Sequence, residues 1–165
     1  MRKINSPVYG TRRPIDCKKV VLAVRSRFPE LGDKQIDVRL EANHCATLFH
    51  FAPRRKDGGY DIDGRVDTIR LPEDTPDFAR VARYAIAHEM AHIVLGHMSL
   101  TSIALSKLPL LNKFYLHFIE RQTDREVIQR GMGEDLCATA EICESLGSRS
   151  SKYLNAQEAR ELIRS

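Results

Sequence analysis

Apolar residues recur every three or four positions along several stretches of this chain, the spacing that places them on one face of an α-helix. The clearest stretch spans residues 78–95, where a helix can be capped by Thr75 or Asp77 and ended by Gly96. Its apolar positions are Val81, Ala85, Ile86, Met90, Ile93 and Val94. Further helices are predicted at 17–28, capped by Asp16, at 110–129 and at 134–146, with a short one after Asn155.

Between the first two predicted helices, apolar and polar residues alternate, as they do in half-buried strands. Strands are predicted at 35–40, 46–51 and 60–71, the last of them kinked at Gly64. The order of one helix, a few strands and then more helices predicts an α+β fold. We expect a small mixed or antiparallel sheet packed against the 78–95 helix, with further helices C-terminal to it. Two prolines and a glycine indicate that residues 1–15 form an irregular arm. Residues 147–165 are expected to form a C-terminal tail with a short helix.

A chain of 165 residues that is 42% hydrophobic can build one domain core, so we expect residues 1–165 to form a single domain. No apolar run approaches the roughly 20 residues that a membrane-spanning helix needs. The N-terminus is basic but is not followed by the apolar stretch that a secretory signal requires. We therefore expect a cytoplasmic protein. The net charge of +4 is mild, which makes nucleic acid an improbable partner. The basic clusters Arg12-Arg13 and Arg54-Arg55-Lys56 are interpreted as solvated loops.

The four cysteines, Cys17, Cys45, Cys137 and Cys143, are scattered and form no Cys-x-x-Cys pair. In a cytoplasmic chain they are expected to be buried thiols rather than disulfides. Cys45 follows His44, which leaves a metal-binding role there as a weak alternative.

The segment His88-Glu89-Met90-Ala91-His92 places two histidines four residues apart, on one face of the predicted helix. Two imidazoles in this arrangement can bind one Zn²⁺ ion, with Glu89 as the general base that takes a proton from the metal-bound water. An ordinary amphipathic helix with two surface histidines is the alternative. The apolar flanks favour the metal site, because a charged triplet buried in such a helix needs a partner.

A catalytic zinc site has three protein ligands and one open position. His97 follows His92 by five residues, about 140° around a continued helix, so it is expected to cap the helix or to pack near the site. Glu120, on the next predicted helix, is the better third ligand. Asp124 shares its face and can accept a hydrogen bond from the free ring nitrogen of a zinc-bound histidine. A solvated face with Glu120 paired to a neighbouring arginine is the alternative.

Stabilisation of a tetrahedral oxyanion needs a hydrogen-bond donor beside the metal. Tyr115, His117 and Arg121 lie close to Glu120 in the sequence, and each is a hypothesis for this role.

Residues 88–97, ending in Leu-Gly-His, and the later Glu120-Arg121-Gln122-Thr123-Asp124 resemble the ImmA/IrrE group of gluzincin metallopeptidases. The resemblance covers about residues 60 to 130. It implies a zincin-like fold, His88, His92 and Glu120 as zinc ligands, and Glu89 as the base. It also implies that a strand before the active-site helix, at Val66–Leu71, pairs with an extended substrate.

Two features depart from the pattern of that group. Thr123 stands where many members have alanine, and residues 125–131 are more polar than expected. The prediction is a zinc metalloendopeptidase that hydrolyses peptide bonds of a protein or peptide substrate. A non-catalytic zinc-binding regulatory protein that retains the fold, and an interaction module with incidental histidines, remain as alternatives.

Overall fold

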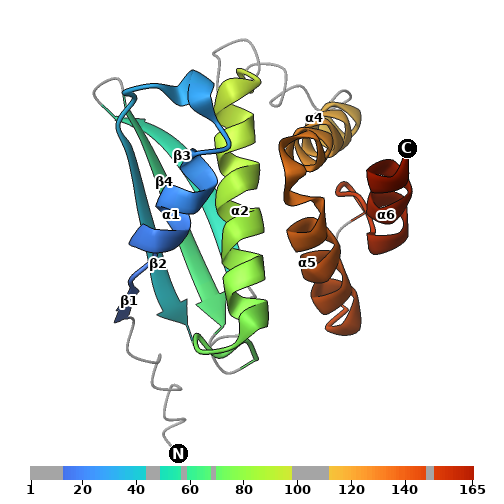
Figure 1. Cartoon of the computed structure of the whole chain (residues 1–165), viewed down its shortest axis with the longest axis horizontal. Coiled ribbons are helices and arrows are strands. Elements are labelled where there is room, and N and C mark those ends of the chain that lie inside the picture. Colours follow the sequence, from blue (N-terminus) through green and yellow to red (C-terminus); the bar gives the residue numbers. More distant parts are fainter. Residues whose placement is uncertain (1–12, 44–48, 57–58, 68–69, 98–111, 148–150) are drawn as a thin grey trace, which may run out of the picture.

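The structure, a computed structural model, describes residues 13–43, 49–56, 59–67, 70–97, 112–147 and 151–165. It is a mixed α+β fold, in which a four-stranded sheet precedes a series of helices (Figure 1). The strands are β1 (Arg13–Ile15), β2 (Ile36–Asn43), β3 (Phe49–Lys56) and β4 (Gly59–Asp67). The helices are α1 (Lys18–Arg25), α2 (Pro76–Val94), α4 (Asn112–Val127), α5 (Gly133–Ser145) and α6 (Ala156–Arg164), with a short 3₁₀ turn at Pro29–Leu31.

The sheet is mixed, with the strand order β1-β2-β4-β3. β2 and β4 are parallel, while β1 and β3 run antiparallel to their neighbours. β1 is formed by the last residues of the segment predicted as an irregular arm, so that prediction is wrong for Arg13–Ile15. Pro14 is compatible with this strand because β1 lies at the edge of the sheet, where a missing backbone donor is tolerated.

The strand predicted at 46–51 lies later in the sequence, as β3 at Phe49–Lys56. Its last residue, Lys56, pairs with Gly59 on β4. No kink occurs at Gly64: its register is continuous, opposite Leu40 on β2 and Phe51 on β3. β4 is hydrogen-bonded on both sides and ends at Asp67. The expectation that Val66–Leu71 pairs with a substrate is therefore wrong for Val66, which is paired on both sides, while residues 68–69 lie outside the described residues. Within the described residues, β3 is the edge strand on this side of the sheet, and its outer edge is open.

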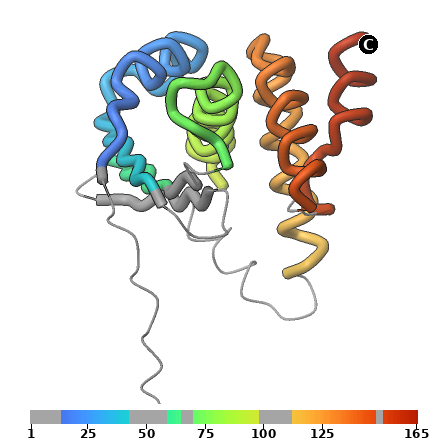
Figure 2. Tube along the Cα trace, turned by 90° about the horizontal axis from the view of Figure 1, so that it is seen from below, coloured from blue at the N-terminus to red at the C-terminus, as the bar shows by residue number. Residues whose placement is uncertain are grey.

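Helices α1 and α2 lie on the same face of the sheet, and α2 separates the sheet from α4, α5 and α6 (Figures 1 and 2). Apolar residues of α1, the sheet, α2 and α5 fill one core cluster, in which Phe28, Ile62 and Leu136 are fully buried. A second cluster lies under the first turns of α2, around Leu40, Phe78 and Val81. Elements on both sides thus cover α2.

The start of α2 follows the prediction, since the Thr75 hydroxyl accepts a hydrogen bond from the Phe78 N–H at 3.2 Å. Every residue from Tyr84 to Ile93 is buried. A helix buried on all sides has no solvent-facing stripe, so polar residues in this stretch must find partners inside the protein.

The predicted 110–129 helix corresponds to α4. The chain then kinks at Gly131, which adopts the left-handed conformation at φ 75°, before α5 begins at Gly133. α6 begins at Asn155, which forms a reciprocal capping box with Glu158. α6 packs on α5, so the expected C-terminal tail is a docked element. Among the described residues, no helix is long and apolar enough to span a membrane.

We expect Leu136→Ala to lower the free energy of unfolding by about 2–5 kcal/mol, because the fully buried Leu136 side chain fills space between α5 and α2. Leu146→Ala, at the exposed end of the same helix, is the matched control and should cost under about 1 kcal/mol. Urea denaturation followed by circular dichroism measures both. Equal losses would show that α5 does not contribute to the core as described.

Candidate metal centre

Three side chains from two helices bring their ligand atoms to one point. His88 and His92 extend from α2, and Glu120 extends from α4. His88 Nε2 lies 2.9 Å from Glu120 Oε2 and 3.1 Å from His92 Nε2. The third side of this triangle, from His92 Nε2 to Glu120 Oε2, is 3.4 Å. The same three residues were predicted from the sequence as metal ligands.

The size of this triangle suits a small divalent ion. Zinc bonds of 2.0–2.1 Å at tetrahedral angles keep the ligand atoms roughly 3.3–3.4 Å apart. The two shorter sides are within a few tenths of an ångström of that spacing. The donor set of two imidazoles and one carboxylate is also that of catalytic zinc sites. The residues therefore fit a metal ion.

Most buried polar side chains gather around this triangle. Asp61 and Thr139 lie elsewhere. The other buried polar or charged side chains of the described residues are His88, Glu89, His92, Thr123 and Asp124. Such a concentration of polar groups in a core is costly unless the groups satisfy one another or hold an ion.

Asp124 supports His88 from behind, as the four-residue spacing from Glu120 predicted. The Asp124 side chain is fully buried, and its Oδ1 lies 3.0 Å from His88 Nδ1. The Tyr84 hydroxyl donates to the same oxygen at 2.7 Å. Oδ2 accepts a hydrogen bond from the Leu154 backbone N–H at 2.8 Å. These contacts hold the His88 ring with Nε2 directed at Glu120.

His92 is supported by uncharged groups. Its Nδ1 lies 2.9 Å from His97 Nδ1 and 3.3 Å from Thr123 Oγ1. His97 Nε2 in turn lies 3.2 Å from Gln122 Oε1. His97 thus packs behind His92, as expected from its angle on the helix, and does not join the group of three.

Glu89 is buried on α2, directly after His88 in the sequence. It is not a member of the triangle. Its negative charge is near enough to contribute to the raised pKa of His88. A carboxylate beside the ligand space, but outside the ligand set, is what a general base requires.

Burial and hydrogen bonds set the protonation of His88, His92 and Glu120. Burial alone lowers the pKa of His88, but hydrogen bonds to Asp124 and Glu120 outweigh it and raise the pKa to about 10. Burial works in the opposite sense on Glu120, yet hydrogen bonds to His88 and His92 hold the pKa of Glu120 well below its ordinary value. Burial lowers the pKa of His92. The site is therefore a charged His88–Glu120 pair beside a neutral His92.

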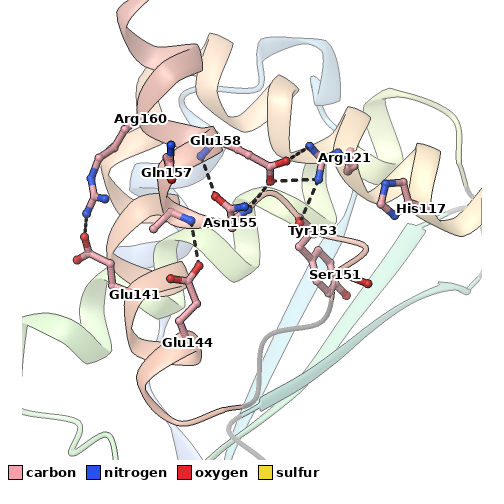
Figure 3. Close-up of a pocket in the computed structure, with 11 residues that line it drawn as sticks. His117, Arg121, Glu141, Glu144, Ser151, Tyr153, Asn155, Gln157, Glu158 and Arg160 are labelled. Carbon is pink, nitrogen blue, oxygen red and sulfur yellow. Dashed lines mark hydrogen bonds and ion pairs between the residues drawn. The ribbon is translucent and has the colours of Figure 1, made fainter.

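The three hypothetical oxyanion donors have different surroundings. Arg121 donates to both carboxylate oxygens of Glu158, at 2.6 and 3.1 Å, and to the Tyr153 carbonyl (Figure 3). His117 is exposed and Tyr115 is half-buried, and the described contacts join neither to the three ligand atoms. The structure does not bring any of them into the triangle.

A polar pocket of about 930 Å³ adjoins this region, between α4, α5 and the segment that leads into α6 (Figure 3). It is lined by His117, Arg121 and Tyr153, among others. Tyr153 also lies edge-on to the His88 ring, at 5.6 Å between centroids. Tyr153 therefore both lines the pocket and contacts the His88 ring.

The three cysteines of the described residues take no part in the site. Cys17, Cys137 and Cys143 are buried free thiols, in agreement with the prediction. Cys45, the weak alternative ligand, lies outside the described residues.

Sequence reasoning missed Tyr84, Tyr153 and the Leu154 backbone amide. Tyr84 precedes His88 by four residues on the same helix, so the spacing that linked Glu120 to Asp124 could have found it. Nothing in the local sequence marks the other two, because they approach the site from the chain segment before α6. In comparisons with known proteins, no family model, curated protein or solved structure matches the chain.

We expect the metal-free protein to lose stability as the pH rises from about 6.5 to about 8.5. The pKa of His88 is raised from 6.5 to about 10, so its charged form stabilises the fold fully below pH 6.5, and this contribution declines toward pH 10. Urea denaturation of the chelator-treated protein at several pH values measures the slope. His88→Gln should flatten it, and a wild-type stability that rises over this range would contradict the assignment.

Proposed function

We propose that the protein is a zinc-dependent peptidase with a zincin-like fold, related to the ImmA/IrrE group. The observation that carries the proposal is the convergence of His88, His92 and Glu120, because the third ligand comes from a different helix than the His-Glu-x-x-His segment. The contacts behind the two histidines support the proposal. His88 and His92 each have a hydrogen-bond partner at Nδ1, which leaves Nε2 for the ion.

In this proposal, His88, His92 and Glu120 would hold Zn²⁺. When bound, the ion would supply a water molecule of lowered pKa and polarise the scissile carbonyl group. Glu89 would serve as the base that accepts a proton from the water and returns it to the leaving amine.

The open edge of β3 is the place for an extended substrate. β4 is paired on both sides, while the described part of the chain pairs β3 only with β4. α2 contacts β3, so a peptide added to this edge runs beside the helix that carries the ligands. An extended peptide would bind there as a further strand through its backbone.

We expect the purified wild-type protein to bind about one Zn²⁺ per chain, and His92→Ala and Glu120→Ala to lose it. Removal of either ligand leaves two donors from the triangle, too few for a tight site. Elemental mass spectrometry after dialysis against zinc measures the content. Arg125→Ala, an exposed residue of α4, is the control. Unchanged zinc in Glu120→Ala would place the third ligand elsewhere.

Glu89→Gln should retain zinc but reduce peptide hydrolysis at least about 100-fold, because the amide cannot accept the proton of the water. Cleavage of a library of quenched fluorescent peptides by the zinc-loaded protein measures the rate. A full-rate variant would exclude Glu89 as the base. If the zinc-loaded wild type cleaves nothing in the library, the result favours the alternative of a zinc-binding regulatory protein.

A further inference from the structure

The end of α2 is shaped so that its chain turns back onto its own last histidine. Gly96 adopts the left-handed conformation at φ 72°. The His97 N–H donates to the His92 carbonyl at 3.0 Å, and the Gly96 N–H to the Ile93 carbonyl at 3.2 Å. This pair of bonds is a Schellman motif. As a result the His97 ring lies against the His92 ring, at 5.1 Å between centroids.

The hydrogen bonds around His97 determine where its proton lies. Gln122 presents its amide oxygen to His97 Nε2, so this nitrogen carries the hydrogen. A neutral imidazole has one N–H, which leaves a lone pair on His97 Nδ1. The 2.9 Å contact must then be donated by His92 Nδ1–H.

Thr123 is consistent with the same direction. Its hydroxyl donates to the Ile119 carbonyl at 2.8 Å, so Oγ1 can only accept from the histidines. Oγ1 lies 3.3 Å from both His92 Nδ1 and His97 Nδ1, and with the hydrogen of His97 on Nε2 it accepts from His92 Nδ1–H alone. With its hydrogen on Nδ1, His92 has a free lone pair on Nε2, the atom that faces His88 and Glu120.

We propose that His97 is a positioning residue for the metal centre: it accepts the His92 Nδ1–H, with its own tautomer set by Gln122, and so directs the His92 Nε2 lone pair to the ion. This inference rests on the proposed metal centre. It assigns a role to Leu-Gly-His at the end of the helix. Gly96 permits the turn, and the turn brings the His97 ring against His92.

The groups that contact Nδ1 of His88 and of His92 would then differ in charge. Asp124 behind His88 is a carboxylate, whereas His97 and Thr123 behind His92 are neutral. Glu89, Glu120 and Asp124 already place three carboxylates around the site. A neutral partner at His92 avoids a further buried negative charge, which would be costly without compensation.

The test is titration of the full chain with Zn²⁺ alone against a competing chelator. His97→Ala should bind zinc about 10–100-fold more weakly, as for loss of an outer hydrogen-bond partner. His97→Asn should retain affinity within about threefold, since its amide oxygen occupies the position of imidazole Nδ1 and can accept the same hydrogen bond. Gln122→Leu should weaken binding, while Gln129→Leu, on an exposed glutamine, is the matched control and should not.

Nitrogen-15 spectra of the histidines in the zinc-loaded protein give a second readout that a packing role would not produce. They should show His92 protonated on Nδ1 and His97 protonated on Nε2. Wild-type affinity in His97→Ala, no recovery in His97→Asn, or a proton on His97 Nδ1 would overturn the inference. If the wild type itself binds no zinc, the proposed function fails with it. If only the His97 variants behave as wild type, the metal centre stands and this inference alone fails.

Discussion

The structure depends on the burial of polar side chains inside α2. From Tyr84 to Ile93 the helix has no exposed face, yet it carries His88, Glu89 and His92. Each such group loses its hydration on folding and must be compensated by a nearby partner. α4 supplies much of that compensation through Glu120, Thr123 and Asp124. The position of α4 against α2 is therefore fixed by polar contacts as well as by apolar packing.

The same requirement extends to the C-terminal part of the chain. Arg121, beside Glu120, forms a forked ion pair with Glu158 of α6. Asp124 uses its second oxygen for the Leu154 amide. α6 and the segment before it thus belong to the support of the candidate metal centre. Apolar burial of Leu154 adds to this attachment, since its side chain is almost fully buried.

Much of the candidate site could be predicted because its signals are local. The His-Glu-x-x-His pattern lies within five residues, and Glu120 and Asp124 are one helical turn apart. The parts that were missed depend on pairing between distant backbone segments. β1 is three residues long, and only its ladder with β2 makes it a strand. Likewise, the position of β4 inside the sheet follows from the order of strands, which no local periodicity encodes.

The contact between Asp124 and Leu154 has a consequence for biosynthesis. During translation α2 and α4 leave the ribosome before residue 154 does. Until then Asp124 lacks its backbone donor, and His88 is held by an incompletely anchored carboxylate. The centre can reach its final geometry only after nearly all of these residues have been synthesised. A nascent chain therefore carries an incompletely supported site, whose hydrogen bonds are completed late, once the segment before α6 has docked.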